Sequence, residues 1–505
     1  MGAVAVRKLL CILLSVCLLL PASGLISAAG EAPAAYAEEG FDNPYPLVVV
    51  RGMDFTDGLR YHAGKEDERV VNVMSNLSAK GVLTVLGRAA AAFVTRGEDG
   101  AVDEIITFAA SLFEGYACDE NGDSLDPEIS SVYYEGNASG CRDAWENAAS
   151  QEEALVRSAV DRYGVENVYF FNYDWRLDTF ENAGKLSEMI GTALEDHGTD
   201  KVDLVCCSMG GILTLTYLNY YGSEHIDSLV SDSATMYGTD VTTDLLLGKV
   251  YFDTDAVLRF LQMKFPQIGG LAKFLYKTKI LERVCGFLNR FAEKYKDKIY
   301  AGVLTPVFGS MPAIWELVQY DSYEDCKAYI FGNSNAYAGL RAKTDRVQNE
   351  VCANMREILD AAMENGMKFG VLTAYNTPNA PAYEHAALQG DGTLETRMMS
   401  FGALVSEVGG ALSDGELAVG EKKYVSADKC INASTALYRD MTWFVKDTSH
   451  VGCVYHSDYT YLIFSILETE SQPTVETWEK YPQFMQAGEG ESLSPLTDAP
   501  GKWDK

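Results

Sequence analysis

Short apolar runs alternate with segments of helical periodicity along most of the chain. The runs Leu47–Val50, Val168–Phe171 and Val202–Cys207 are almost wholly apolar and rich in β-branched and aromatic residues. Between the last two, apolar residues recur at steps of three and four over residues 186–194. Such runs are typical of strands buried on both faces, and the periodic segments between them predict crossover helices. We therefore predict an α/β fold with a mostly parallel sheet and helices on both of its faces.

Two blocks break this alternation. Residues 55–150 show no regular succession of strand and helix, and we expect them to leave the sheet as an excursion. From 240 to 365 helical patterns dominate, for example over Leu271–Lys298 and Val347–Met363. A helical block between strands indicates a cap inserted over the sheet.

The remaining segments complete the predicted organisation. The first part of the core occupies residues 38–239, and the second part, which occupies 366–470, closes the sheet with the strand Trp443–Val445. Residues 471–505 are polar and contain several prolines, so we expect a mostly irregular tail.

The first residues resemble an export signal. Arg7 and Lys8 precede the apolar segment Leu9–Leu20, which is too short for a permanent membrane helix. Small residues around Ala37 offer a cleavage site, and Ala29 offers an earlier one. We therefore expect residues 1–37 to be a signal peptide and the product to be secreted.

Charge narrows the classes of partner. The chain has 41 Lys and Arg against 72 Asp and Glu, which gives a formal net charge of −31. A surface this negative repels nucleic-acid backbones and anionic membranes at long range, so we expect no nucleic-acid partner. Hydrophobic residues make up 47% and charged residues 22%, which is ordinary for a folded soluble protein.

The cysteines give little guidance. Of the eleven, Cys11 and Cys17 lie in the signal, and the odd remainder leaves at least one unpaired. Their spacing matches no zinc pattern. Cys118 and Cys141 flank a polar loop and are the one pair that we name as a disulfide candidate.

The strongest chemical signal follows the third strand. Val202–Cys207 runs into Ser208–Gly211 and then directly into a helical segment, which is the context of a nucleophile elbow. The sharp turn requires small neighbours, a demand that Gly210 meets, while Cys206 replaces the first glycine of the usual pattern. The alternative is an ordinary strand-to-helix turn with Ser208 as the helix cap.

A serine needs a base, and in this architecture the chain order is serine, acid, histidine. Beyond the cap stand His385, His450 and His456. We prefer His450, which follows the strand 443–445 after a short turn. His456 remains the alternative, and His385 is expected to be structural.

The acid and the oxyanion donors complete the predicted site. Asp391 lies in a Gly-Asp-Gly-Thr turn after the predicted strand 369–373. The backbone N–H groups of Met209, after the nucleophile, and of Met53, after Gly52, are the expected oxyanion hole.

Four segments together resemble the lecithin:cholesterol acyltransferase-like family, which includes lysosomal phospholipase A2 and phospholipid:diacylglycerol acyltransferases. The segments are Asn172–Leu177, with its Tyr-Asp-Trp-Arg signature, Ser208–Gly211, Gly390–Leu394 and Met311–Leu317. The likeness spans roughly 45–470, with residues 55–150 poorly matched.

By this resemblance the fold is that of an α/β hydrolase with a cap, and Ser208, Asp391 and His450 are the triad. The chain departs from the usual pattern of this family at two positions. Arg51 stands where relatives carry a small residue or proline, and Cys206 stands where the elbow has a glycine or another small residue. For the Tyr-Asp-Trp-Arg segment we favour a scaffolding role over direct contact with substrate.

We therefore predict a secreted serine acyl hydrolase or O-acyltransferase that works through an acyl-enzyme on ester-linked lipids. Such chemistry needs no cofactor or metal, and a membrane or lipid aggregate is a further expected partner. Aromatic residues of the cap are expected to form a wall against the acyl chain, namely Phe260, Phe265, Phe274, Tyr276 and Phe287. The alternatives are a carboxylesterase for small soluble esters and a silent binding protein with the same fold.

Overall fold

The computed structural model describes residues 44–55, 58–72, 79–146, 151–332, 334–452, 456–488, 492–498 and 503. The predicted signal peptide, residues 1–37, lies outside these ranges. Across the residues described, no helix combines the length and the apolar character that crossing a membrane requires.

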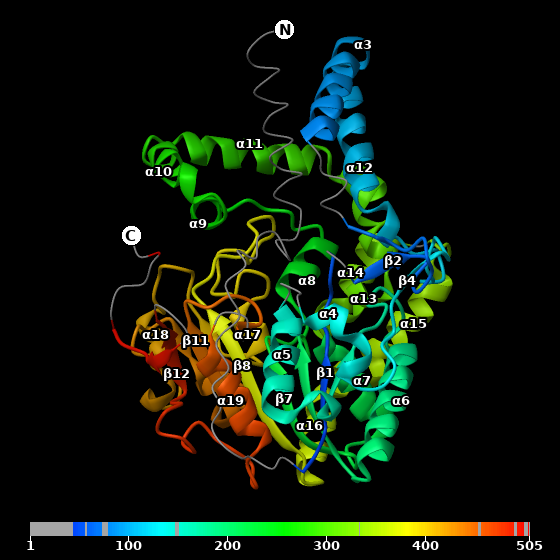
Figure 1. Cartoon of the computed structure of the whole chain (residues 1–505). Coiled ribbons are helices and arrows are strands. Elements are labelled where there is room, and N and C mark those ends of the chain that lie inside the picture. The colour runs from blue at the N-terminus through cyan, green and yellow to red at the C-terminus, as the bar shows by residue number, and fades with distance from the viewer. Residues whose placement is uncertain are drawn as a thin grey trace.

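An eight-stranded sheet runs through the middle of the molecule (Figure 1). Its strands lie in the order β13-β12-β11-β8-β7-β6-β1-β5, and every neighbouring pair is parallel except β12 and β13. The strands are β1 (Leu47–Val50), β5 (Val168–Phe171), β6 (Val202–Cys207), β7 (Ile226–Asp232), β8 (Lys368–Tyr375), β11 (Thr442–Lys446), β12 (Phe484–Ala487) and β13 (Leu493–Pro495).

Helices cover both faces of this sheet. They are α5 (Gln151–Tyr163), α6 (Thr179–His197), α7 (Gly210–Tyr221), α16 (Met355–Glu364) and α19 (Ser457–Leu467). Because side chains alternate along a strand, Leu47 and Val49 pack in the core with α5 and α19, whereas Val48 and Val50 pack with α6, α7 and α16. This arrangement confirms the predicted α/β-hydrolase type of fold.

The sheet continues beyond the strand at which we expected it to close. Segments β12 and β13 lie within 471–505, which the sequence analysis predicted to be mostly irregular. Phe484 stacks on Phe444 of β11 with ring centroids 5.4 Å apart, and Met485 is fully buried. The other described residues of 471–505 form no helix or strand. The expectation that the strand 443–445 closes the sheet was wrong, because two short strands gain their stability from a sheet edge that already exists, which no local pattern reveals.

Residues 55–150 form structure of their own beside the sheet. A small antiparallel sheet has the order β3-β2-β4, and a long helical segment rises from it. At Gly97 the backbone leaves helical geometry, so α3 is a hairpin whose halves pack Val85 and Ala89 against Ala101 and Ile105. The elements are β2 (Leu59–Tyr61), β3 (Arg69–Val70), α3 (Ala79–Leu112), β4 (Ile129–Ser131) and α4 (Arg142–Trp145).

Helices also fill most of residues 240–365. They are α8 (Asp240–Leu246), α9 (Thr254–Lys264), α10 (Gly269–Lys277), α11 (Ile280–Lys294), α12 (Lys296–Ile299), α13 (Pro312–Glu316), α14 (Tyr323–Phe331) and α15 (Ala338–Glu350). The continuous helix expected over 271–298 is broken at Lys279, which adopts a left-handed φ of 60°. The one expected over 347–363 is broken between α15 and α16.

The last helix of this block belongs to the face of the sheet. Met355 and Leu359 of α16 lie in the same core as β1 and α7, directly before β8. Between β8 and β11 the chain forms α17 (Thr396–Met399), β9 (Leu404–Val405), α18 (Asp414–Leu417) and β10 (Ile431–Asn432).

The disulfide candidate is not formed. Cys118 and Cys141 are both free and buried. Burial raises the pKa of the Cys118 thiol to about 12 and that of Cys141 to about 11, so both side chains act as small apolar groups of the core.

Candidate active site

Ser208 stands in the sharp turn between β6 and α7. Its φ is 50°, a left-handed conformation that costs a non-glycine residue roughly 1–3 kcal/mol. A Cβ added to Gly210 would lie 2.7 Å from the Val50 carbonyl oxygen, and one added to Gly211 would lie 2.8 Å from the Ala234 Cβ. The turn therefore requires glycine at both positions and holds Ser208 in the strained geometry of an elbow.

Cys206 packs inside this elbow. Its side chain is fully buried, and the thiol lies 3.6 Å from the Val230 carbonyl oxygen as a weak donor. Burial raises the pKa of Cys206 to about 12, so the thiol stays protonated.

His450 and Asp391 are in direct contact. His450 Nδ1 lies 2.6 Å from Asp391 Oδ2, and the backbone N–H of His450 donates to the Asp391 carbonyl oxygen at 2.9 Å. The other carboxylate oxygen accepts from the N–H groups of Thr393 and Leu394 at 2.9 and 2.7 Å. Both side chains are buried, so the turn 390–394 fixes the carboxylate and the carboxylate fixes the imidazole.

The topology explains why these two residues meet. His450 follows β11 and Asp391 follows β8, which are neighbouring parallel strands that end at the same edge of the sheet. A backbone bond from the Thr377 N–H to the Gly390 carbonyl oxygen, 2.9 Å long, returns the Asp391 turn to this edge.

The two other histidines take different places. His456 precedes α19 as its N-cap, and its carbonyl oxygen accepts from the Tyr459 N–H at 3.1 Å. His385 Nδ1 lies 2.7 Å from Asp244 Oδ2. Asp244 and Glu384 also pair with the Lys249 ammonium, which already supplies positive charge to this cluster, so we assign no metal to it.

Ser208 follows β6, which β7 separates from β8, and it reaches the same end of the sheet. Its N–H donates to the Asp232 carbonyl oxygen at 3.3 Å, and the Val451 N–H donates to Ser233 Oγ at 3.4 Å. The segments that carry Ser208 and His450 therefore meet at Asp232 and Ser233. Within the described ranges, the Ser208 hydroxyl makes no direct hydrogen bond to the His450 imidazole.

Three carboxylates act on the His450 imidazole. Burial is the largest effect and lowers the pKa of His450, but the contact with Asp391 and the charges of Glu152 and Asp232 together outweigh it, so the pKa lies above its ordinary value. Asp232 is itself buried, which raises its pKa to about 7, although the Tyr459 hydroxyl donates to it at 2.7 Å.

Gly52 lies directly against the serine. A Cβ at this position would come within 2.6 Å of the Ser208 Cβ and 3.2 Å of the Cys207 carbonyl oxygen. The Gly52 N–H donates to Glu152 Oε1 at 3.0 Å. Met53 follows Gly52 and is partly buried, and Met209 stands at the N-cap of α7, where backbone N–H groups and the helix dipole favour negative charge.

Arg51 holds the Gly52 loop in place. It is only 3% exposed, and its guanidinium contacts the Glu153 carboxylate at 3.0 Å, the Asp54 carboxylate at 2.5 Å and Asn172 Oδ1 at 3.3 Å. The departure from the family pattern at this position is thus matched by acidic partners on α5 and on the loop itself.

The Tyr-Asp-Trp-Arg segment has the structural role that we favoured. Arg176 is fully buried, and its guanidinium donates to both Asp174 carboxylate oxygens, to the Gly115 carbonyl oxygen and to the Ile129 carbonyl oxygen. The Trp175 indole N–H donates to the Asp54 carbonyl oxygen at 3.1 Å. The segment therefore ties the 55–150 excursion and the Gly52 loop to the end of β5.

The fourth family-like segment packs against this one. The Ala313 N–H donates to the Arg176 carbonyl oxygen at 3.4 Å, and Glu316 Oε1 accepts from the Thr179 N–H at 3.2 Å. Trp315 is fully buried and stacks on Phe331 with centroids 4.9 Å apart. Met311–Leu317 is thus part of the scaffold.

Sequence reasoning missed Glu152 and Asp232. Glu152 opens a helix, where acidic residues are common, and Asp232 ends a strand, where polar residues are common. The neighbouring Glu153 stands in the same first turn of α5, and its carboxylate pairs with Arg51 at 3.0 Å. The approach of α5 to the elbow makes Glu152 important, and the loop of His450, which packs over the end of β7, makes Asp232 important.

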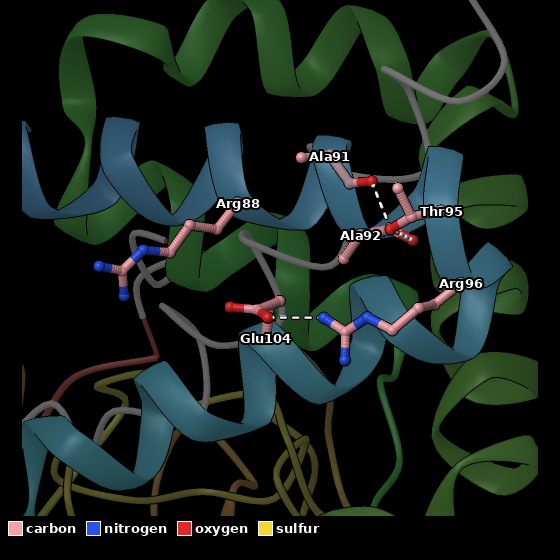
Figure 2. Close-up of a pocket in the computed structure, with 6 residues that line it drawn as sticks. All are labelled: Arg88, Ala91, Ala92, Thr95, Arg96 and Glu104. Carbon is pink, nitrogen blue, oxygen red and sulfur yellow. Dashed lines mark hydrogen bonds and ion pairs between the residues drawn. The ribbon is translucent and has the colours of Figure 1, made fainter.

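A hollow of about 500 Å³ lies away from this site, between the two halves of α3 (Figure 2). Within it Arg96 Nη2 donates to Glu104 Oε1 at 2.7 Å, and Thr95 Oγ1 donates to the Ala91 carbonyl oxygen at 3.0 Å. Its lining residues are Arg88, Ala91, Ala92, Thr95, Arg96 and Glu104, so it contains no residue of the predicted site.

The comparisons with known proteins agree with the motifs. Residues 159–268 match the family model described as "Lecithin:cholesterol acyltransferase", which confirms the resemblance; the matched range includes Ser208 but ends before Asp391 and His450. No curated protein matches the chain. Among solved structures, the chain is similar to one described as "The crystal structure of Tle4-Tli4 complex". The two chains are 10% identical with a TM-score of 0.35, and the match covers 84% of this chain and 97% of that one.

Proposed function

We propose, from the premise that this chain is a lecithin:cholesterol acyltransferase-like protein, that it is a secreted serine enzyme which transfers acyl groups from ester-linked lipids to water or to an alcohol. The family match supports lipid acyl hydrolysis or transfer in general. The serine mechanism rests on the site itself.

The mechanism uses the residues at the carboxyl edge of the sheet. Ser208 attacks the ester carbonyl, and His450 removes its proton and delivers it to the leaving alcohol. Asp391 keeps the imidazole oriented through Nδ1 and stabilises the imidazolium that forms. The N–H groups of Met53 and Met209 receive the negative charge on the former carbonyl oxygen. Water or an alcohol then takes the acyl group from Ser208.

The observation that carries this proposal is the buried His450–Asp391 contact at the sheet edge where Ser208 adopts a left-handed φ. A strained serine and an imidazole fixed by a carboxylate are unusual in the same small region unless they serve nucleophilic catalysis.

Substrate length separates the lipid enzyme from a carboxylesterase. We expect the chain to hydrolyse long-chain esters in vesicles or emulsions faster than monomeric short-chain esters, and Ser208→Ala to abolish both activities. Activity confined to dissolved short esters would favour the carboxylesterase. A folded protein with neither activity would favour the silent binding protein.

Secretion rests on the sequence of residues 1–37. We expect the protein recovered from the culture medium to begin near residue 38, as N-terminal sequencing can show. A full-length product retained in the cells would contradict this part of the proposal.

A further inference from the structure

The corner formed by α9, α10 and α11 has an unusual number of exposed apolar side chains. Leu271 and Phe274 of α10 are 56% and 59% exposed, far more than core side chains. The whole set, which we name the α10 face, is Phe265, Ile268, Leu271, Phe274 and Ile280. Two of these, Phe265 and Phe274, were expected to line an acyl-binding wall, and their exposure argues against that role.

The charge around this face is opposite to that of the rest of the chain. No aspartate or glutamate occurs from residue 256 to residue 281, in a chain whose formal charge is −31. The exposed basic residues of this corner are Lys273, Lys277, Lys279, Arg283, Arg290 and Lys294. Its exposed acids are Glu282, which pairs with Lys279 at 3.1 Å, and Glu293 at the far end of α11, which lies 3.9 Å from Lys296.

The corner projects from the body but is held at both ends. In Figure 1 it stands above the sheet, with α11 running across to α3. Leu281, Cys285 and Leu288 turn the apolar side of α11 inward, so the α10 face is not simply an unpacked core. At the far end, Lys298 pairs with Asp103 of α3 at 2.8 Å.

The near end of the corner connects to the candidate active site. The Tyr251 N–H donates to the Ala382 carbonyl oxygen at 3.3 Å, and Ala382 packs with Phe252 and Phe260 beneath α9. The loop that contains Ala382 leads within a few residues to the turn of Asp391. A surface that binds the α10 face therefore lies on the side of the molecule to which the site belongs.

We propose that the α10 face docks onto a lipid surface that carries anionic headgroups. This inference rests on the proposed function and names the surface on which the enzyme works. Exposed apolar side chains enter the boundary between headgroups and acyl chains, and lysines around them pair with anionic headgroups. The negative body is repelled by the same surface, which orients the molecule with this corner foremost.

A second copy of the chain fits the face less well. The acidic body of another copy would complement the lysines, but five exposed apolar side chains gain little from a charged surface. A lipid surface supplies both the apolar phase and the negative charge.

Co-sedimentation with vesicles tests the proposal without relying on catalysis. In the Ser208→Ala background, we expect binding to vesicles of phosphatidylcholine mixed with phosphatidylglycerol, and weaker binding to phosphatidylcholine alone or at high salt. Lys273→Glu/Lys277→Glu should weaken binding to the mixed vesicles by at least about tenfold. Leu271→Glu/Phe274→Glu should weaken it on both kinds of vesicle.

Matched variants away from the corner serve as controls. Leu125 is 58% exposed, so Leu125→Glu is the control for the loss of an exposed apolar side chain in Leu271→Glu/Phe274→Glu. Lys65→Glu/Lys422→Glu, at two exposed lysines, is the control for the change in charge in Lys273→Glu/Lys277→Glu. Both should bind vesicles as the parent does. In the catalytically intact chain, the α10-face variants should retain turnover of a soluble short-chain ester and lose turnover on vesicles.

Three results would overturn the proposal. The first is equal vesicle binding by the α10-face variants and their controls. The second is binding that does not depend on phosphatidylglycerol. The third is a dimer in sedimentation velocity that Leu271→Glu/Phe274→Glu dissociates, without vesicle binding by the parent. Because binding is measured with Ser208→Ala, failure of the serine mechanism would leave the result interpretable.

Discussion

The imidazole of His450 and the carboxylate of Asp391 lie 2.6 Å apart, although 59 residues separate them in the chain. Neighbouring parallel strands bring them to one edge of the sheet, and backbone N–H groups hold the carboxylate from behind. An imidazole oriented in this way presents its second nitrogen with a fixed tautomer, which is what a general base for Ser208 requires.

Replacement of this carboxylate tests the pair. Asp391→Asn keeps the acceptor for the Thr393 and Leu394 N–H groups but places an amide against His450 Nδ1. We expect kcat to fall by about 10³–10⁴, because the imidazole loses its orientation and the imidazolium its stabilising charge. Steady-state kinetics with near-native circular dichroism would check this. An unchanged kcat would contradict the assignment of the acid.

The two nearby histidines offer a direct comparison. His450→Ala should abolish turnover per folded molecule, whereas His456→Ala should lower it little, because the contact with Asp391 belongs to His450. The folded fraction of each variant, measured by circular dichroism, corrects for any loss of stability. The reverse order of effects would transfer the role of base to His456.

The glycine beside the serine gives a steric test. Gly52→Ala places a Cβ 2.6 Å from the Ser208 Cβ unless the backbone moves. We expect kcat/KM to fall by about 10²-fold or more, since the shift disturbs the loop that we propose to supply an oxyanion donor. Gly191→Ala in α6, where a Cβ meets nothing within 4 Å, is the matched control and should retain full activity. Equal activity of both variants would argue against the predicted oxyanion loop.

Asp232 provides a test of the pH dependence. A histidine acts as a general base only when neutral, and the charges of Asp391, Glu152 and Asp232 raise the pKa of His450, the proposed base. Asp232→Asn removes one of these charges, so the pKa of His450 falls and the acidic limb of the kcat/KM profile moves to lower pH. Asp227→Asn, on the same strand but paired with Lys368 at the other end, should leave the limb in place.

The same variant makes a prediction about stability. Burial raises the pKa of Asp232 to about 7, so the folded state prefers the protonated form and loses stability as the pH rises through that value. The free energy of unfolding of Asp232→Asn, relative to the parent, should therefore increase over this range. Urea unfolding at a series of pH values measures it, and a flat difference would contradict the burial of an ionisable carboxyl.

The Arg51 network is expected to stabilise the fold. Arg51→Met removes the cation that pairs with the buried carboxylate of Glu153 and with the partly buried carboxylate of Asp54, which costs about 3–5 kcal/mol. Lys279→Met, which breaks the exposed pair with Glu282, should cost less than about 1 kcal/mol. Urea unfolding checks both. Equal effects would mean that Arg51 is accessible to solvent.

Much of the fold could be predicted because its signals are local. The apolar runs of β1, β5 and β6, and the glycines after Ser208, follow from burial on two faces and from the space available in a sharp turn. The order serine, acid, histidine then selected Asp391 and His450, which the structure brings together.

The remainder depends on contacts between distant segments. Glu152 matters because α5 approaches Gly52, a hundred residues away, and Asp232 because the loop of His450 packs over the end of β7. The strands β12 and β13 need the edge of β11 before they can form. No periodicity or motif in one segment contains these relationships.

The central claim is that Ser208 is a nucleophile activated at this edge of the sheet. Covalent labelling with a fluorophosphonate, followed by mass spectrometry of the intact protein, tests it most directly. We predict the addition of one label on Ser208, no label in Ser208→Ala, and much slower labelling in His450→Ala. Persistent labelling of Ser208→Ala, or a folded parent protein that never reacts, would contradict the account.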